Sequence, residues 1–199
     1  DDIDVVKLQK TLENIKGSSQ QAHELLENLL MWARTQTGSI VYRPVPVDLC
    51  AQAEQSIELV AVQAARKNIN IVSEFTSCGL INGDVNMMST VLRNLLTNAL
   101  KFTPRNGEVR VEITKNDGFC IFSVKDNGIG IPPERLKYLF SIDTAHKTRG
   151  TDQEPGTGLG LILCKEFIEK HGGYLEVESE AGKGSEFRVI IPGKSDKEM

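Results

Sequence analysis

The stretch FCIFSVKDNGIGIP, residues 119–132, joins a predicted β-strand to a glycine-rich turn. Cys120, Phe122, Val124 and Asp126 alternate along the strand, so their side chains share one face. The first three are apolar, and burying the carboxylate that ends this face is costly unless a hydrogen-bond donor meets it. An adenine amino group is such a donor. Because D-N-G also forms an ordinary Asx-type turn, this segment alone leaves both interpretations open.

Glycines follow this strand at Gly128 and Gly130, and they recur further along the chain in PGTGLGL, residues 155–161. Gly128 and Gly130 allow the backbone to approach a ligand closely. The second group of glycines stands directly before a helix that we expect over residues 159–171. Backbone N–H groups at such a helix start favour a phosphate. The sequence has neither the dinucleotide-fold spacing nor the P-loop pattern G-x-x-x-x-G-K-[ST].

A strongly amphipathic helix is predicted over residues 84–103. Its apolar face consists of Met88, Leu92, Leu95, Ala99 and Phe102. Asn94, Asn98 and Lys101 recur at i, i+4 and i+7, which aligns their tips in one row. An Asn carbonyl oxygen can bind Mg²⁺, whose other ligands are then phosphates and water. The lysine adds positive charge for a phosphate. On this segment alone, an ordinary solvated helix face is the favoured interpretation of these three residues.

The remaining pattern predicts an α/β fold, in which helices cover one face of a mixed β-sheet as a two-layer sandwich. A helix begins at Asp48, which is a typical N-cap, and its expected buried face is Leu49, Ala53, Ile57, Val60, Ala61 and Ala64. Strands are predicted over residues 69–75, 80–82, 107–115, 119–126, 174–180 and 185–192. A short helix is expected near residues 133–139.

A long helix is predicted over residues 1–37, where apolar residues recur at alternating spacings of three and four. The seam consists of Val5, Leu8, Leu12, Ile15, Ser19, Ala22, Leu26, Leu29 and Ala33. Leu25, Leu30 and Trp32 widen the stripe, as a bundle helix requires, and Gly38 ends the helix. This pattern predicts a partner helix. A surface helix packed on the following domain is the less favoured alternative.

These patterns divide the chain into four parts. Residues 1–38 form the bundle helix, and residues 39–47 form a linker that its two prolines keep extended. The α/β domain occupies residues 48–192, and residues 193–199 are a polar tail. Because the chain begins inside a periodic pattern and without Met, we expect it to be a piece of a longer protein.

The segment between the two glycine-rich stretches, roughly residues 127–157, is expected to be a lid or disordered. Lys137, His146, Lys147 and Arg149 give it cations that could close over a polyphosphate. For each of these side chains an ordinary solvated charge is the preferred interpretation.

Composition narrows the class of protein. The 199 residues carry a net charge of −4, which argues against a non-specific nucleic-acid binder. No apolar run is long enough to span a membrane. The four cysteines are far apart and form neither a zinc cluster nor a disulfide framework. We therefore expect four buried thiols in a reducing compartment, a cytoplasmic location and no membrane contact within this chain. The sequence leaves open whether the parent protein is anchored in the inner membrane.

Several segments, in order, resemble the boxes of the GHKL superfamily of ATP-binding domains, and specifically its bacterial histidine-kinase branch. RNLLTNALKFTP (93–104) resembles the N box, DNGIGIP (126–132) the first glycine box, and GTGLGL (156–161) the second glycine box. Phe140 stands where an F-box aromatic is expected, and GKGSEFRVIIP (182–192) resembles the end of the domain. The resemblance covers residues 45–192 and implies a Bergerat-type α/β sandwich.

The resemblance also implies an ATP site with Mg²⁺. Its expected residues are Asn94, Asn98, Lys101, Asp126, Gly128, Gly130, Phe140, Gly156, Thr157, Gly158, Leu159 and Gly160. Asp126 is expected to read adenine, and Asn98 to be the Mg²⁺ ligand. Hydrolysing branches of the superfamily carry a glutamate where this chain has Asn94. An amide cannot activate water as a base, which favours a kinase over an ATPase.

LLENLLMWARTQTG (25–38) resembles the second helix of a kinase dimerisation and phosphotransfer domain. The H box of the first helix is absent, and the one histidine before residue 45 is His23, which is disfavoured as a phosphoacceptor. The chain is therefore expected to bind Mg²⁺-ATP without autophosphorylating and to contain no catalytic phosphoacceptor. In the full-length protein we expect a homodimer that phosphorylates its own histidine and then a response-regulator aspartate. Two alternatives remain, namely a GHKL protein-serine kinase and a non-catalytic nucleotide-binding or assembly module.

Overall fold

The computed structural model describes residues 5–76, 78–141, 149–152, 154, 156 and 158–193. The chain divides into two compact units, Asp1–Ile40 and Val41–Met199. Each unit is described separately below.

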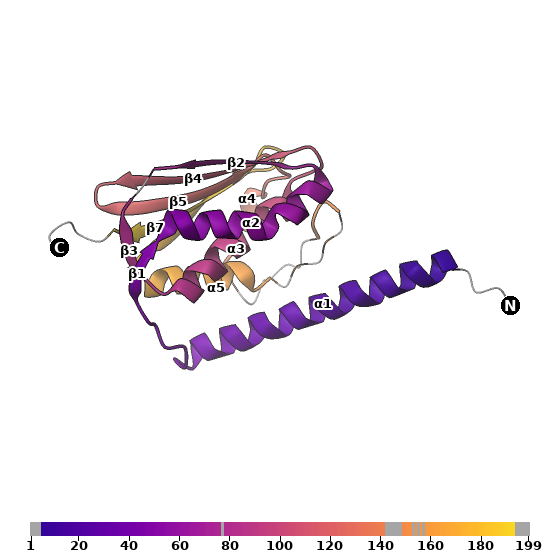
Figure 1. Ribbon diagram of the computed structural model, residues 1–199, viewed down its shortest axis with the longest axis horizontal. Helices are drawn as coiled ribbons and strands as arrows, with labels where there is room; N and C mark the ends of the chain where they lie inside the picture. The colour runs from indigo at the N-terminus through magenta and orange to yellow at the C-terminus, as the bar shows by residue number, and fades with distance from the viewer. Residues whose placement is uncertain are drawn as a thin grey trace. The chain divides into compact units, whose positions relative to one another are not determined.

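The first unit is a single long helix, α1, over Val5–Gln36 (Figure 1). The helix ends at Gln36, Gly38 follows with a left-handed φ of 67°, and Ser39 donates its N–H to the carbonyl of Arg34 at 2.9 Å. The predicted helix is therefore confirmed from Val5, together with its glycine stop, whereas residues 1–4 lie outside the described residues. The helix exposes a broad set of large apolar side chains, namely Leu8, Leu12, Ile15, Leu25, Leu26, Leu29, Leu30 and Met31.

The second unit is built on a five-stranded mixed sheet in the order β2-β4-β5-β7-β6. The strands are β2 (Asn70–Phe75), β4 (Glu108–Asn116), β5 (Phe119–Asp126), β6 (Tyr174–Glu180) and β7 (Gly184–Pro192). β2 runs parallel to β4, whereas the other neighbouring pairs are antiparallel. This order makes β5, which ends at Asp126, the central strand.

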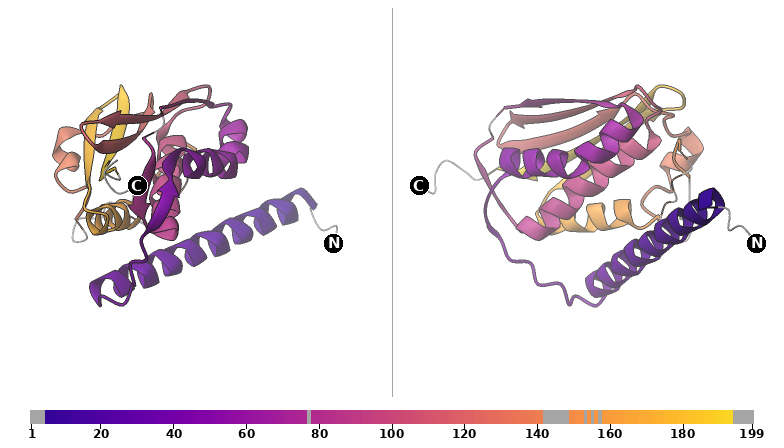
Figure 2. Two further views of the ribbon diagram at one scale, coloured as in Figure 1. Left: turned by 60° about the vertical axis from the view of Figure 1, so that its left-hand side comes forward. Right: turned by 45° about the vertical axis from the view of Figure 1, so that its right-hand side comes forward.

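Three helices cover one face of this sheet (Figures 1 and 2). They are α2 (Leu49–Lys67), α3 (Val85–Phe102) and α5 (Gly160–Lys170). A short helix, α4, spans Pro133–Leu136, and β1 (Val45–Asp48) pairs antiparallel with β3 (Leu80–Gly83). The predicted two-layer α/β sandwich, preceded by one long helix, is confirmed.

The helices begin and bury their faces largely as the sequence pattern indicates. The Asp48 carboxylate accepts hydrogen bonds from the N–H groups of Cys50 and Ala51, so the predicted N-cap is confirmed. The predicted buried face of α2 is wrong at Ala61, which is exposed, whereas Lys67 at the end of the helix is buried. The buried stripe of α2, which packs against α3, instead runs through Ala53, Ser56, Val60, Ala64 and Lys67.

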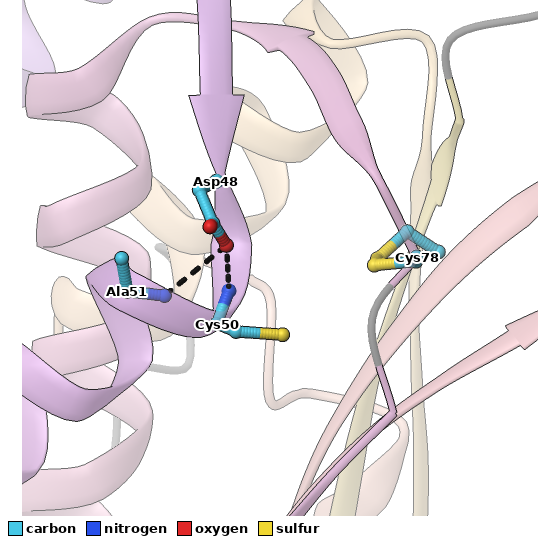
Figure 3. The surroundings of a disulfide bond; sticks show 5 residues. Asp48, Cys50, Ala51 and Cys78 are labelled. Carbon is cyan, nitrogen blue, oxygen red and sulfur yellow. Dashed lines mark hydrogen bonds between the residues drawn. A yellow bond between two sulfur atoms is a disulfide. The ribbon is translucent and has the colours of Figure 1, made fainter.

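The cysteines do not follow the prediction of four buried thiols. Cys78 and Cys120 form a disulfide bond with a Cα–Cα distance of 5.5 Å across a sequence separation of 42 residues. Cys50 is free and partly exposed, and its side chain points toward Cys78 (Figure 3). Only the prediction for Cys164, a free buried thiol, is confirmed. The fold brings the start of β5 beside the segment that precedes β3, a proximity that sequence spacing does not reveal.

A buried histidine joins the two helices that flank the site described below. His171 follows α5, and its Nε2 accepts the N–H of Asp84, the N-cap of α3, at 3.0 Å. Its Nδ1 therefore carries the proton and donates to the carbonyl of Phe167 at 2.6 Å. The ring of Tyr42 packs edge-on against the imidazole at 5.0 Å, and the N–H of Arg43 donates to the Asp84 carboxylate.

Across the described part of the chain, we find no helix whose length and apolar character would let it cross a membrane.

Candidate functional site

Two segments that lie far apart in the sequence contact α3. They are the turn that follows β5 and the start of α5. At the start of α5, a Cβ atom on Gly160 would lie 3.0 Å from Oδ1 of Asn94. Asn94 also hydrogen-bonds the thiol of Cys164, one turn further along α5. Burial raises the pKa of this thiol to about 12, so it is a neutral packing group. The second glycine segment is therefore seated against Asn94.

The first glycine segment lies against the C-terminal end of α3. The N–H of Ile129 donates to the carbonyl of Phe102 at 3.1 Å. A Cβ atom on Gly128 would lie 2.4 Å from the same carbonyl oxygen, which leaves no room for any side chain at this position. On its other side, Ile129 accepts a hydrogen bond from the N–H of Gly182 in the β6–β7 turn. The glycine turn is thus held between α3 and the last hairpin.

Asp126 lies beside the first glycine segment, close to the C-terminal end of α3. Its side chain is 6% exposed and ends the buried face of β5, as predicted. One carboxylate oxygen accepts the N–H of Gly128 at 2.9 Å. Burial raises the pKa of Asp126 to about 6, while hydrogen bonds from the backbone of Gly128 and Ser185 act in the opposite direction. A carboxylate has about four acceptor positions, so the group keeps capacity for a ligand donor.

The polar row on α3 is half-buried along its length. Asn94, Asn98 and Lys101 all have intermediate exposure, and they lie on successive turns of the helix. The ammonium group of Lys101 lies 4.9 Å from the ring centroid of Phe102. The row therefore runs from the start of α5, at Asn94, toward the glycine turn beside Phe102.

The remaining predicted residues precede α5 in the chain or lie beside it. Leu159, the residue before this helix, is buried. Its apolar side chain cannot accept a hydrogen bond, so it does not cap the first N–H groups of α5. Gly156 and Gly158 are half-buried. The ring of Phe140 lies 5.8 Å from the ammonium group of Lys165 on α5.

Some predictions fall outside the described residues or away from the cluster. Thr157, His146 and Lys147 lie outside the described residues. Lys137 and Arg149 are exposed. Within the described ranges, no group of three or more His, Cys, Asp or Glu side chains is placed to hold a metal ion.

Sequence reasoning missed a buried lysine that touches the end of α3. Lys67 is 3% exposed, and its ammonium group donates to the carbonyls of Leu100 and Lys101 at 2.8 and 3.2 Å. It also contacts Thr151 and Glu154, in the segment that leads to the second glycine stretch. A signal existed in the sequence, because Lys67 continues the helical spacing of buried residues at Ala53, Ser56, Val60 and Ala64.

Comparison with known proteins agrees with this geometry. Residues 83–195, more than half of the chain, match the family described as "Histidine kinase-, DNA gyrase B-, and HSP90-like ATPase". The chain therefore belongs to this family of ATPases. Its second unit is a GHKL ATP-binding domain of the sensor-histidine-kinase type, as the relatives below indicate.

Two curated relatives and one solved structure illustrate the similarity. Sporulation kinase C of Bacillus subtilis is 39% identical over 145 residues, which cover 72% of this chain and 32% of the relative. The circadian input-output histidine kinase CikA of Synechococcus elongatus is 32% identical over 184 residues, covering 91% of this chain and 24% of the relative. The structure of full-length ShkA in complex with AMPPNP gives a TM-score of 0.76 at 28% identity, covering 93% of this chain and 38% of that one. The chain thus spans about a quarter to a third of the curated relatives that it matches.

Proposed function

We propose that this chain binds Mg²⁺-ATP as the catalytic part of a sensor histidine kinase. The observation that carries the proposal is Asp126, a carboxylate buried at the end of the central strand, where it accepts the N–H of Gly128 in the first glycine segment. A buried carboxylate with spare acceptor capacity suits the amino group of adenine. The similar ShkA structure contains AMPPNP, an analogue of ATP, which supports a nucleotide as the ligand.

The groups beside Asp126 suit a triphosphate. The N-terminus of α5 offers backbone N–H groups and the positive end of the helix dipole. The ammonium of Lys101 adds a positive charge at the other end of the α3 row. Gly156, Gly158 and Gly160 allow close approach of a phosphate, and we assign Thr157 to the same loop from its sequence position.

The half-buried amides of α3 fit a magnesium ion that shares its ligands with phosphates. Asn98 is our candidate for the protein ligand, because its carbonyl oxygen is a hard donor in the middle of the row. When bound, Mg²⁺ would offset the charge of the phosphates. Asn94 orients the start of α5 by contact and, as an amide, is no base for water.

The structure of the site therefore favours transfer of the γ-phosphate to a protein over hydrolysis. We propose a histidine on a dimerisation helix outside this chain as the acceptor, with relay to a response-regulator aspartate. We also propose that the apolar stripe of α1 pairs with helices of a second copy in the full-length protein. The relatives named above are kinases, which supports this assignment. The domain limits at residues 38, 47 and 192 and a cytoplasmic location belong to the same proposal.

Calorimetric titration of ATP and GTP, each with Mg²⁺, tests the nucleotide site first. Wild type should bind ATP in preference to GTP, and Asp126→Asn should lose this binding. Asp117→Asn is a matched control, since Asp117 is an exposed residue in the turn at the opposite end of β5. Equal binding of ATP by wild type and Asp126→Asn would contradict the adenine assignment.

A phosphotransfer assay on the full-length protein tests the reaction. Radiolabel from γ-labelled ATP should appear on histidine and then on a receiver aspartate. Label on serine would instead identify a GHKL protein-serine kinase. ATP binding without label on any residue would identify a non-catalytic nucleotide-binding module.

A further inference from the structure

Lys67 makes an unusual set of contacts for a lysine at a helix end. Its ammonium group is almost completely buried and has four oxygen partners within 3.2 Å. Two are carbonyls in the last turn of α3, Leu100 and Lys101, which belong to the unsatisfied group at a helix C-terminus. The other two are the hydroxyl of Thr151 and the carboxylate of Glu154. Burial of an ammonium is costly without such partners, so this arrangement is specific.

Two of the partners of Lys67, Thr151 and Glu154, belong to a turn in which the structure describes residues 150–152 and 154. The N–H of Thr151 and its hydroxyl both contact the carbonyl of Lys101, at 3.0 and 3.1 Å. Gly150 donates its N–H to the carbonyl of Glu154 at 2.8 Å. A Cβ atom on Gly150 would lie 2.5 Å from Cγ of Lys101, so the turn lies directly on the aliphatic stem of this residue. An exposed ion pair of Arg105 with Asp152, at 2.7 Å, adds to the same attachment.

The turn and the start of α5 are fixed to the same helix at two places. Thr151 and Glu154 are fixed to the C-terminal turn of α3 through Lys67, and Gly160 is fixed to Asn94 in the middle of α3. The second glycine stretch connects these two attachments, with five residues between Glu154 and Gly160. The six Cα–Cα steps from Glu154 to Gly160 reach at most about 22 Å, so the two attachments bound how far this stretch can extend.

We infer that Lys67 is a positioning residue for phosphate binding, although no predicted contact with nucleotide involves it. It holds the turn that contains Thr151 and Glu154 against α3, and it thereby holds the N-terminal end of the second glycine stretch in place. Ordering the turn only when nucleotide binds would reduce affinity, whereas a turn that is already held against α3 avoids that cost. This inference rests on the proposed function, because it concerns the phosphates of the same nucleotide. It predicts that Lys67 affects binding of the triphosphate and leaves recognition of adenosine at Asp126 unchanged.

The test compares ATP with AMP in calorimetric titrations of the whole chain in Mg²⁺ buffer. We expect Lys67→Met to raise the Kd for ATP about tenfold and to leave the Kd for AMP within about twofold of wild type. Arg66→Met is the matched control, since Arg66 is the preceding residue, its side chain is exposed, and the same charge is removed. It should bind both nucleotides like wild type.

A second pair of variants covers the case in which Lys67→Met does not fold. Thr151 is half-buried and contacts Lys67 through its hydroxyl. Thr151→Val removes this hydroxyl and keeps the shape of the side chain, whereas Thr151→Ser keeps the hydroxyl. Thr151→Val should raise the Kd for ATP selectively, and Thr151→Ser should restore it.

The outcomes separate this inference from the proposed function. If folded Lys67→Met and Thr151→Val bind ATP as wild type does, or lose ATP and AMP to the same extent, the positioning role is wrong while the nucleotide site stands. If wild type binds neither nucleotide, the proposed function fails and the inference fails with it.

Discussion

At the scale of single residues, the buried carboxylate of Asp126 would make the proposed adenine recognition sensitive to pH. Its pKa of about 6 lies above the ordinary value of 3.8, so a fall in pH from 7 to 5 protonates it. A protonated carboxyl loses acceptor capacity for an amino group. We expect affinity for adenosine, which does not titrate in this range, to fall through pH 6. Titrations with adenosine, followed by NMR at several pH values between 5 and 8, would show this decrease. An affinity of wild type that does not change with pH would refute it.

The raised pKa of Asp126 also predicts that the stability of the fold increases as the pH falls, whereas the affinity for adenosine decreases. Because the folded protein raises the pKa of Asp126, it binds the proton more tightly than the unfolded chain does. Asp126 therefore destabilises the fold above pH 6, by about 3 kcal/mol for a shift of this size, and this cost disappears as pH falls toward 4. Asp126→Asn should be more stable than wild type at pH 7, and the difference should shrink to about a third of that value at pH 4.5. Urea unfolding at both pH values measures the difference, with Asp117→Asn as the control.

Gly160 shows how one missing side chain can bring two segments together. A Cβ atom at this position would press on Oδ1 of Asn94 at 3.0 Å. Alanine favours the helix by about 1 kcal/mol over glycine, and this gain opposes the cost of the close contact with Asn94. Gly160→Ala should therefore hardly change the melting temperature. It should nevertheless weaken ATP binding, because Asn94 must move. Calorimetry together with thermal melts separates the two effects, and unchanged ATP affinity would show that this contact has no part in the site.

At the scale of secondary-structure elements, local patterns were sufficient for the helices and for most strands. The spacing around Met88 and Leu92 identified α3, and Asp117–Gly118 identified the β4–β5 turn. The alternation along β5 placed Asp126 on a buried face. These features depend on neighbours within a few residues, which is why a sequence can reveal them.

Contacts between distant segments could not be derived in this way. The pairing of Cys78 with Cys120 depends on how the segment before β3 lies against the start of β5. The partners of Lys67 lie 33 to 87 residues away. The helical stripe could have indicated that Lys67 is buried, but its partners follow only from the tertiary fold. The seating of Gly160 against Asn94 depends likewise on the packing of α5 on α3.

The disulfide between Cys78 and Cys120 should stabilise the second unit. It closes a loop of 42 residues, for which a chain-entropy argument gives about 4 kcal/mol. Addition of a reductant, or the substitution Cys78→Ser, should lower the melting temperature measured by calorimetry. Cys50→Ser is the control, because Cys50 is a free thiol on the same side of the domain. A melting temperature that is unaffected by reductant would contradict the role of this bond.

At the scale of the whole molecule, the division into two units predicts that the second unit folds alone. It contains the complete five-stranded sheet and the three helices that cover it. A chain of residues 41–199 should keep its cooperative unfolding and bind ATP within about twofold of the full chain, since the proposed site lies within this unit. Circular dichroism and calorimetry test both expectations. Loss of ATP binding in a folded truncated chain would show that α1 contributes to the site.

The isolated helical unit should behave differently. α1 exposes its apolar stripe, and a single amphipathic helix gains most of its stability by packing. A peptide of residues 1–40 should therefore change its helicity with concentration. The one tryptophan of the chain, Trp32, lies in this helix, so its fluorescence would report self-association directly. Helicity that is independent of concentration would refute pairing through this stripe.

The buried imidazole of His171 connects the ends of the two helices that border the proposed nucleotide site. The end of α5 and the start of α3 meet there, while Gly160 and Asn94 meet about 15 Å away along both helices. Tyr42 and Arg43, in the linker that arrives from α1, touch this same point. If either helix tilts by a few degrees at the His171 contact, its residues about 15 Å away move by about 1 Å. A misplacement of this size slows a reaction strongly. We therefore expect the position of Tyr42 and Arg43 to influence how Asn94 and Gly160 align in the proposed phosphate site.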